Sequence, residues 1–419
     1  MPDIDSAVSR LPFPATGVPW ADLEQQLVRA KGDDIDWRAG KLALYNYYRD
    51  EELLRVVQDA YRLYFAENAL GKRIFPSLAK MESEVVEMGL SLFDAPPTGG
   101  GSFTSGGTDS IFLAVCAARN AKPVKGRPNI VGCETLHPAF NKAAMFLGLD
   151  VIRTPMGADF RADPAALEAA IDENTVMIAA SAPGFSHGVF DPIAEIGAIA
   201  QRHGLWFHVD ACLGGFLAPF WREIGQPVPD FDFNVAGVTS LSADLHKFGF
   251  AARGASLLLL RDAALKQHHR FEFGGWPCGI YETETFSGSR PGGSVAAAWT
   301  IMNHLGRTGY IQNARLILDA KTRLIAGIEA IPGLEVVRPS ELCILLIRST
   351  DAALDLDALA ELLGRAGWYV ARIVSPKSIL QSLNPVHAAS AEGFLADLRA
   401  AADEVRTKAL RGQEDLRTY

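Results

Sequence analysis

The clearest pattern of apolar and polar positions lies between residues 99 and 261, where short apolar runs alternate with stretches long enough for a helix. Such runs are typical of buried strands, and the stretches between them are long enough for the crossover helices that parallel strands require. The pattern predicts an α/β domain with a mostly parallel sheet covered on both faces. The predicted strands are 129–133, 151–154, 176–181, 205–209 and 255–260, and the predicted helices are 139–147, 164–171 and 192–203.

The flanking segments have a different periodicity. Residues 1–40 are rich in proline and charge and predict an arm with a short helix near 21–30, whereas apolar residues between 50 and 89 recur at helical spacing around an irregular stretch, 68–76. A long predicted helix leads from Gly292 toward Pro332. Beyond it we predict strands at 334–338, 343–348, 368–374 and 379–383 and helices at 356–364 and 391–406. We therefore divide the chain into an N-terminal arm with helices (1–95), a large domain (96–310) and a small C-terminal α+β domain (311–419).

Composition and charge limit the kinds of molecule that the protein is expected to bind. The 419 residues include 40 Lys and Arg against 49 Asp and Glu, so the net charge of −9 disfavours binding to nucleic acid. No stretch of 18 uninterrupted apolar residues predicts a membrane span. The start of the chain lacks the basic and apolar regions of a signal peptide, so we expect a cytoplasmic protein.

Cysteine and histidine spacing does not suggest a metal site. The five cysteines are widely separated and predict reduced thiols, not a disulfide framework. His268 and His269 are adjacent, and because neighbouring residues cannot face one ion from one side of a helix, we interpret them as a solvated surface pair. We predict no bound metal.

The first candidate for chemistry is the glycine-rich stretch from Gly99 to Thr108, which we interpret as a loop before a helix that begins at Asp109. Glycines allow close approach of a ligand to the backbone, and the unpaired N–H groups at a helix N-terminus bind phosphate. The stretch lacks both the GK[ST] of a nucleoside triphosphate loop and the G-x-G-x-x-G dinucleotide spacing. By itself, the pattern fits a phosphate cradle and an ordinary turn with a helix cap about equally well.

Two further motifs follow along the chain. Asp210 ends an apolar strand before a glycine turn, at the sheet edge where open parallel sheets bind ligands, although it could simply cap that turn. Lys247 follows His246 in the motif Ser240-Leu-Ser-Ala-Asp-Leu-His-Lys, and a desolvated lysine is suited to Schiff-base chemistry. A phosphate loop, a strand-end aspartate and a downstream lysine, in this order, predict pyridoxal phosphate, because this cofactor needs donors for its phosphate, an anion at its ring nitrogen and an amine for its aldehyde.

Several sequence motifs of the chain are similar to those of a known family. The stretches that carry the similarity are Thr104-Ser-Gly-Gly-Thr-Asp-Ser, His137-Pro-Ala-Phe-Asn-Lys, His208-Val-Asp-Ala-Cys-Leu-Gly-Gly-Phe and Gly288-Ser-Arg-Pro-Gly-Gly, together with the segments that begin at Ser181 and Gly237. They resemble the sphingosine-1-phosphate lyases, a branch of the group II pyridoxal-phosphate decarboxylase superfamily. The resemblance runs from about Tyr47 to the C-terminal helix. It implies a fold-type I pyridoxal-phosphate enzyme with a seven-stranded sheet, active as a homodimer that shares its active sites.

The resemblance also implies a role for individual residues. Lys247 becomes the Schiff-base lysine, Asp210 the partner of the pyridine nitrogen and His137 the imidazole stacked on the cofactor ring. Positions that hold the cofactor phosphate in the family correspond to Gly107, Thr108, Ser242 and His246, with Gly288 and Ser289 reaching the phosphate in the neighbouring subunit. Tyr47, Asn68, Arg253 and Tyr281 fall at positions expected to face the substrate.

The departures from the family concern the substrate. Family members have a histidine three residues after the asparagine that matches Asn68 and use it to hold the substrate phosphate, whereas this chain has Gly71, then Lys72 and Arg73. A family lysine and tyrosine that follow the catalytic lysine are here Arg253 and Phe250. Arginine can hold a phosphate or a carboxylate with two parallel hydrogen bonds, so an anionic substrate is still expected.

Three functions remain open at this stage. The first is retro-aldol cleavage, in which a β-hydroxy amine with a phosphate or other anionic group, such as a sphingoid base 1-phosphate, gives an aldehyde and an amine. The second is decarboxylation of an amino acid, which uses the same electron sink. The third is a catalytically silent protein that binds pyridoxal phosphate. Because Lys247, Asp210 and His137 are all retained, the sequence favours an enzyme, and retro-aldol cleavage is our first choice.

Overall fold

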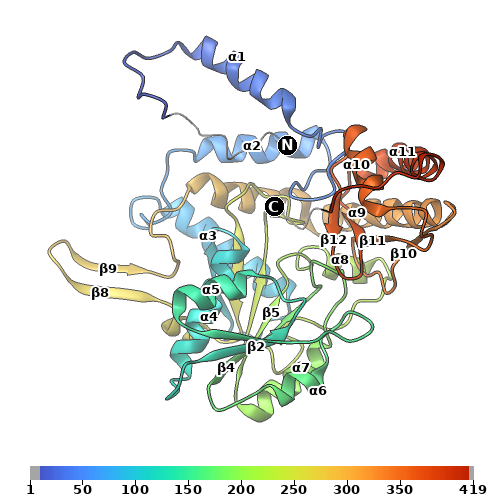
Figure 1. Cartoon of the computed structure of the whole chain (residues 1–419). Coiled ribbons are helices and arrows are strands. Elements are labelled where there is room, and N and C mark those ends of the chain that lie inside the picture. Colours follow the sequence, from blue (N-terminus) through green and yellow to red (C-terminus); the bar gives the residue numbers. More distant parts are fainter. Residues whose placement is uncertain (1–9, 415–419) are drawn as a thin grey trace.

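A seven-stranded sheet forms the centre of the computed structural model, which describes residues 10–414 (Figure 1). The strand order is β1-β7-β6-β5-β4-β2-β3; β2 to β6 run parallel, and β7 is antiparallel to both of its neighbours. The mostly parallel sheet predicted from the sequence is therefore confirmed. Its strands are β1 (Gly100–Thr104), β2 (Asn129–Cys133), β3 (Asp150–Thr154), β4 (Thr175–Ser181), β5 (Trp206–Asp210), β6 (Ser240–Ala243) and β7 (Ser256–Leu260).

Helices cover both faces of this sheet. On one face, α4 and α5 bury an apolar cluster that includes Ile111, Phe140 and Met177, whereas Phe207 and Ile196 belong to the larger core on the other face. This two-sided burial explains why the central strands are apolar in nearly every position. The helices that pack around this sheet are α3 (Pro76–Leu92), from the N-terminal segment, and α4 (Gly107–Ala121), α5 (Ala139–Leu147), α6 (Pro164–Ala169), α7 (Ile193–His203) and α8 (Ala218–Glu223).

The N-terminal segment contains α1 (Trp20–Ala30), a short 3-10 helix (Lys31–Asp33) and α2 (Glu51–Leu63), so the predicted helix near 21–30 is confirmed. Helix α1 stands off the body of the molecule and buries none of its side chains (Figure 1). Helix α2 is capped by Asp50, whose carboxylate accepts a hydrogen bond from Leu53 N, and it packs on the long helix α9.

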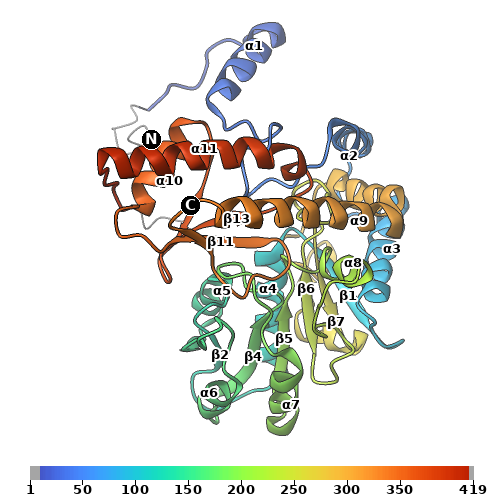
Figure 2. The same cartoon turned by 90° about the vertical axis from the view of Figure 1, so that its right-hand side faces the viewer.

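The C-terminal part forms a second, smaller layer beside the main sheet (Figure 2). Helix α9 (Gly292–Glu329) is interrupted at Gly306, where the backbone leaves helical geometry, and the predicted boundary at residue 310 falls within this helix. An antiparallel sheet in the order β10-β11-β13-β12 packs with two helices, as the predicted α+β pattern requires. These elements are β10 (Leu334–Val336), β11 (Ile344–Ser349), α10 (Leu356–Arg365), β12 (Ala371–Ile373), β13 (Ser378–Ser382) and α11 (His387–Lys408).

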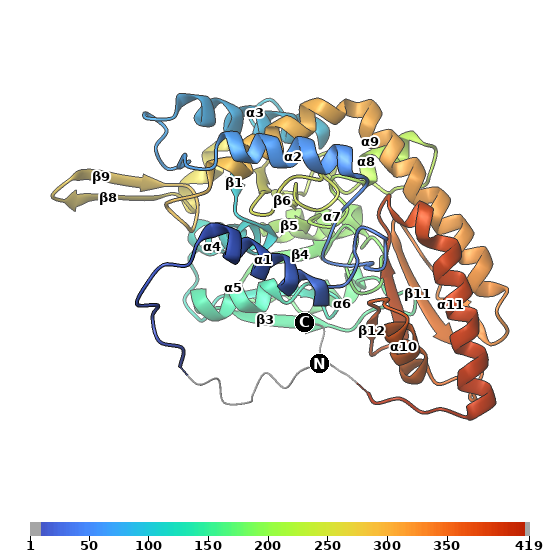
Figure 3. The ribbon, with the colours of Figure 1, turned by 90° about the horizontal axis from the view of Figure 1, so that it is seen from above.

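Three features differ from the sequence prediction. Most of the glycine-rich stretch is not a loop but strand β1, in which a Cβ on Gly101 would lie 2.7 Å from a methyl group of Leu259. Strand β6 was not predicted. Nor was the hairpin of β8 (Phe271–Trp276) and β9 (Gly279–Thr283), which follows a 3-10 helix (Ala263–His268) and projects from the body (Figure 3).

Neither the N-terminal helices nor any other helix among residues 10–414 is both long and apolar enough to cross a membrane. The predicted surface pair of histidines is wrong for His269, which is 7% exposed with its Nε2 3.5 Å from the Ser102 hydroxyl. Burial lowers the pKa of this imidazole to about 4, so His269 is neutral at pH 7. The reason is that the segment folds back against β1 instead of continuing into solvent.

Candidate active site

A cavity of about 590 Å³ lies at the carboxyl ends of β4, β5 and β6, beside the N-terminus of α4. This is the edge of an open parallel sheet at which ligands bind, because crossover connections leave a crevice there. Eight of the residues predicted from the sequence line this cavity: Tyr47, Gly107, Thr108, His137, Asp210, His246, Lys247 and Arg253.

Asp210 is the last residue of β5 and is 8% exposed. Its Oδ1 accepts hydrogen bonds from Cys212 N at 3.0 Å and from the Ser242 hydroxyl at 3.4 Å. The parallel pairing of Asp210 with Ser242 in β6 brings these side chains together. A buried carboxylate that lines the cavity is placed to face a cationic ring nitrogen.

Lys247 lies in the turn after β6 and forms an ion pair with Asp244, with Nζ 2.9 Å from Oδ2. Burial is the largest influence and acts to lower the pKa of Lys247, but Asp244, Cys212 and Tyr47 together outweigh it and raise this pKa well above its usual range. Without a ligand, the amine is therefore held protonated. Asp244 was not among the residues predicted for the site, although it stands three positions before Lys247 in the same motif.

His246 contributes the other contact to Asp244. Its Nδ1 accepts a hydrogen bond from Ala255 N, and its Nε2 lies 3.5 Å from Asp244 Oδ2. Burial lowers the pKa of the imidazole to about 4, so His246 is neutral and carries its proton on Nε2. It therefore places a neutral N–H group near the carboxylate but adds no charge.

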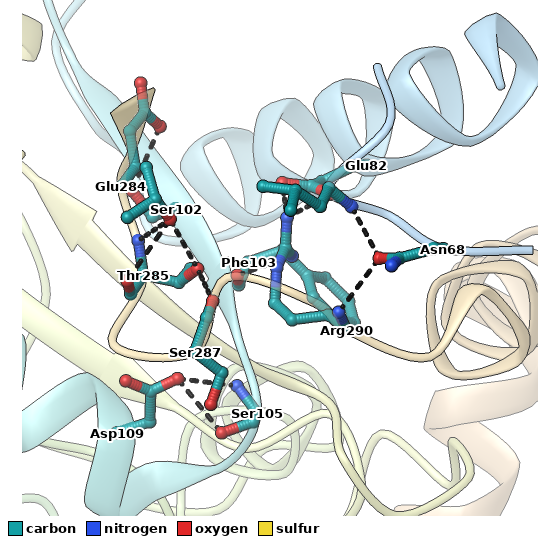
Figure 4. Close-up of polar contacts among 12 residues, drawn as sticks. Asn68, Glu82, Ser102, Phe103, Ser105, Asp109, Glu284, Thr285, Ser287 and Arg290 are labelled. Carbon is teal, nitrogen blue, oxygen red and sulfur yellow. Dashed lines mark hydrogen bonds and ion pairs between the residues drawn. The ribbon is translucent and has the colours of Figure 1, made fainter. Parts of the chain in front are cut away.

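The turn between β1 and α4 brings the backbone to the cavity. Gly106 has a φ of +153°, and α4 begins at Gly107, so the first N–H groups of the helix are free of intrahelical partners. A Cβ on Gly107 would lie 2.7 Å from Cys212 Sγ and 2.9 Å from Asp244 Oδ1, which explains the glycine. The turn is closed by Asp109, whose carboxylate accepts hydrogen bonds from Ser105 N and Oγ (Figure 4).

His137 follows β2 and forms part of the cavity wall. Its Nδ1 accepts a hydrogen bond from Ala139 N at 3.1 Å, which assigns the proton of the neutral ring to Nε2. Burial lowers the pKa of His137, so the neutral ring is favoured. A neutral, fixed imidazole can pack on a flat aromatic cofactor.

Tyr47 and Arg253 lie where this cavity adjoins another of about 380 Å³. The guanidinium carbon of Arg253 is 5.8 Å from the centre of the Tyr47 ring, and burial raises the pKa of the Tyr47 hydroxyl to about 12. Tyr47 therefore remains protonated and can donate a hydrogen bond. An exposed arginine and a phenol at one edge suit an anionic ligand.

The five other predicted residues lie elsewhere. Gly288 lines a separate cavity of about 600 Å³, with the Tyr281 hydroxyl 2.3 Å from where a Cβ on Gly288 would be. Asn68 Nδ2 donates a hydrogen bond to Ser289 Oγ at 2.9 Å, and Asn68 Oδ1 accepts one from Arg290 N (Figure 4). The fifth, Ser242, is fully buried behind Asp210 and does not line the catalytic cavity.

Comparison with known proteins agrees with this geometry. Residues 43–347 match the model of the pyridoxal-dependent decarboxylase conserved domain. The chain is 38% identical over 407 residues to sphingosine-1-phosphate lyase of Arabidopsis thaliana, a match that covers 94% of this chain and 74% of the relative. The chain belongs to the sphingosine-1-phosphate lyase family. The solved structure of the Burkholderia pseudomallei sphingosine-1-phosphate lyase has a TM-score of 0.90 and 33% identity, covering 96% of this chain and 94% of that one.

One relative in the comparison is named for a different reaction. The chain is 34% identical over 326 residues to a probable L-tyrosine/L-aspartate decarboxylase of Methanothermobacter thermautotrophicus, covering 77% of this chain and 87% of the relative. The chain is thus similar to a decarboxylase as well as to the lyases. The predicted pyridoxal phosphate enzyme and its lyase class are confirmed.

The residues of this sphingosine-1-phosphate lyase family member fit pyridoxal phosphate on physical grounds. Lys247 Nζ, Asp210 and the start of α4 open onto one cavity, so an amine, an anion and a set of backbone donors are available to a single ligand. The close packing of Gly107 leaves no space for a side chain beneath that ligand. Asp244 Oδ1 is buried without a hydrogen bond among the described residues, and the ligand side of the cavity is where it could gain one.

Proposed function

We propose that the protein cleaves the Cα–Cβ bond of a β-hydroxy amine that carries a phosphate or another anionic group, such as a sphingoid base 1-phosphate, and releases an aldehyde and an amine. The observation that carries the proposal is the shared cavity of Lys247, Asp210 and His137, with Arg253 at its edge. Relatives named as sphingosine-1-phosphate lyases match more than nine-tenths of the chain.

Each residue has a task in this reaction. Bound pyridoxal phosphate supplies the electron sink that makes bond cleavage at the α-carbon accessible. Lys247 would hold the cofactor and, with substrate bound, would deliver a proton to the α-carbon in place of the proton that a base removes from the β-hydroxyl group. Asp210 keeps negative charge at the ring nitrogen, and His137 fixes the plane of the ring. Arg253 and the protonated Tyr47 bind the anionic group of the substrate.

We also propose a homodimer in which each subunit completes the active site of the other. Supporting this proposal, Gly288 lines a cavity that is separate from that of Lys247 in the same chain, and its neighbours Tyr281, Ser289 and Asn68 do not line the Lys247 cavity either. Residues of one functional site can be divided in this way when the site is formed by two copies related by a twofold axis. The five free cysteines fit a reducing compartment, and we propose the cytoplasm.

Decarboxylation of an amino acid is the second candidate, and the archaeal decarboxylase relative favours it. Arg253 could bind a substrate carboxylate as well as a phosphate. The two reactions are distinguished by incubating the purified holoenzyme with a phosphorylated long-chain base and with a panel of amino acids, and measuring aldehyde and carbon dioxide. Aldehyde from the phosphorylated base supports the lyase, whereas carbon dioxide from an amino acid without aldehyde would replace it with the decarboxylase.

A further inference from the structure

A row of buried polar side chains lies directly beneath Asp210. Residues 206, 208 and 210 of β5 alternate onto one face of the sheet, and the parallel register pairs His208 with Ser240 and Asp210 with Ser242 of β6. His208, Ser240 and Ser242 have no exposed surface, and Trp206 is only 7% exposed. Polar groups at this depth must find partners within the protein.

These side chains form a continuous series of hydrogen bonds. Trp206 Nε1 donates to Ser240 Oγ at 2.7 Å, and Ser240 Oγ lies 2.8 Å from His208 Nδ1. On the other side of the imidazole, Nε2 lies 3.2 Å from Ser242 Oγ. Ser242 Oγ donates to Asp210 Oδ1 at 3.4 Å.

The two ends of the series fix the direction of every bond in it. The indole N–H of Trp206 can only donate, and an ionised carboxylate can only accept. Ser242 has one hydroxyl proton and gives it to Asp210, so it must accept from His208 Nε2. The neutral ring of His208 then accepts at Nδ1 from Ser240, whose oxygen accepts from Trp206.

The charge state of His208 agrees with this direction. Burial lowers its pKa to about 4, so the ring is neutral at pH 7 and has one donor and one acceptor nitrogen, as the series requires. The only charged group facing it in the series is Asp210, which acts against burial and only partly offsets it. Phe140 of α5 packs edge-on at 5.8 Å and closes the ring off from the other side.

The geometry points to Trp206, Ser240 and His208 as positioning residues that hold the Asp210 carboxylate turned so that Oδ2 faces the ring nitrogen of pyridoxal phosphate. Both hydrogen bonds that residues 10–414 give this carboxylate, from Cys212 N and Ser242 Oγ, end on Oδ1. Oδ2 is left for the cofactor in the cavity that Asp210 lines. The inference rests on the proposed role of Asp210 and extends it by three residues that touch neither cofactor nor substrate.

The experiment measures the protonation of the cofactor's ring nitrogen directly and needs no substrate. Each apoprotein variant is loaded with ¹⁵N-labelled pyridoxal phosphate, the protonation of the ring nitrogen is followed by NMR as pH rises, and the Kd of the cofactor is measured separately. In Ser240→Ala we expect the ring nitrogen to lose its proton at lower pH and the Kd to rise about tenfold. Ser240→Thr keeps a hydroxyl and should restore both values.

Thr175→Val is the matched control, because Thr175 is fully buried in the neighbouring strand β4 and its hydroxyl donates to Asp172, away from the cavity. It should lower thermal stability without moving the ring-nitrogen signal. If Ser240→Ala does not fold, Trp206→Phe removes the first donor with little change in volume and should shift the signal in the same direction. A ring-nitrogen titration in Ser240→Ala and Trp206→Phe that matches Thr175→Val would overturn the inference.

This experiment can distinguish failure of the inference from failure of the proposed function. Absence of lyase activity leaves the NMR titration unaffected, because no substrate is present. An unchanged ring-nitrogen signal in Asp210→Asn would instead remove the premise that Asp210 faces the nitrogen, and the inference would fall with it.

Discussion

The catalytic cavity and the separate cavity at Gly288 have nearly the same volume, about 590 and 600 Å³, but differ in how their charges are held. In the catalytic cavity, Lys247 is paired with the buried Asp244, whose Oδ1 has no hydrogen bond among residues 10–414. At the other cavity, Arg290 forms a buried ion pair with Glu82, but Lys72 and Arg73 are exposed and form no ion pair within the described part of the chain. The cation of the first cavity is therefore paired within the chain, whereas the second cavity also presents two unpaired cations to its surroundings.

This difference matters for the division of the proposed active site. A buried ion pair must be preorganised, because an unpaired charge there is costly. An exposed, unpaired cation costs little free energy because water solvates it. It contributes to binding only when another surface places an anion beside it. The contrast is what we expect if the second cavity of one subunit faces the catalytic cavity of its partner.

The largest effect should come from removing the amine of the catalytic cavity. Lys247→Ala should lower kcat by at least about 1,000-fold, since loss of a proton-transfer group alone has effects of this order. The purified wild-type protein should be yellow, and borohydride reduction followed by peptide mapping should attach the cofactor to Lys247. Attachment at another lysine would contradict the assignment. As a control for the activity measurement, Lys122→Ala should retain activity, because Lys122 binds Thr175 O outside the cavity.

Pairing two inactive chains tests whether the two cavities combine. Ser289→Asp places a negative charge where the partner's cofactor phosphate is proposed to bind, and should be inactive as a homodimer. Co-expressed with Lys247→Ala, it should recover about one quarter of wild-type activity, because half of randomly paired dimers are mixed and each mixed dimer has one intact site. Lys247→Ala co-expressed with itself is the control. No recovery in the mixed sample, with mixed dimers shown by mass spectrometry, would place both residues in one site of one chain.

Much of the catalytic cavity could be predicted from the sequence because its residues lie at the ends of apolar runs. Strand β2 and helix α5 are confirmed to the residue at 129–133 and 139–147, and Asp210 lies at its strand end as expected. Strand β6 escaped prediction because its face toward His208 is made of Ser240 and Ser242, so it lacks a continuous apolar run. Strand β1 escaped because glycine is rare in strands, and its glycines are explained by close packing of Gly100 on Ala263 and of Gly101 on Leu259 of β7.

Interactions that depend on strand register could not be predicted from the sequence. The contact of His208 with Ser240 joins residues that are 32 positions apart, and it exists only because β5 and β6 pair in one particular alignment. The ion pair of Lys247 with Asp244 is local and could have been anticipated from spacing alone. The Gly288 cavity could not be derived in either way, because its walls come from the hairpin base and from segment 69–74.

A smaller effect is expected at the edge of the catalytic cavity. Arg253→Ala should lower kcat/KM for a phosphorylated long-chain base by about 10- to 100-fold, which is the loss of one charge-assisted hydrogen bond. The unphosphorylated form of the same base should be much less affected. Gly71→His should raise kcat/KM for the phosphorylated form. A Cβ there would lie 3.3 Å from the Phe75 ring, so this ring has to shift by a few tenths of an ångström to admit the side chain.

Arg202→Ala is the matched control for Arg253→Ala, because Arg202 forms an ordinary surface ion pair with Glu168. If the phosphorylated base has no advantage in the wild-type enzyme and Arg253→Ala changes nothing, the anionic substrate group is wrong. Decarboxylation or an uncharged substrate would then move ahead.

Binding of the cofactor to the catalytic cavity should depend on the charge of Lys247. Burial acts to lower the pKa of Lys247, but Asp244 together with Cys212 and Tyr47 raises it, so the apoprotein keeps an ammonium group that cannot attack an aldehyde. The rate of cofactor capture should therefore rise with pH, about tenfold per pH unit, between about pH 6 and 9. Asp244→Asn leaves burial unopposed and lowers the pKa, so capture at pH 7 should be faster and its pH dependence flatter.

Stopped-flow absorbance with apoprotein measures both, and Asp232→Asn, at a buried carboxylate that caps Asn234 N, should behave as wild type. Capture that is independent of pH in the wild-type protein would mean that Asp244 does not hold the amine protonated.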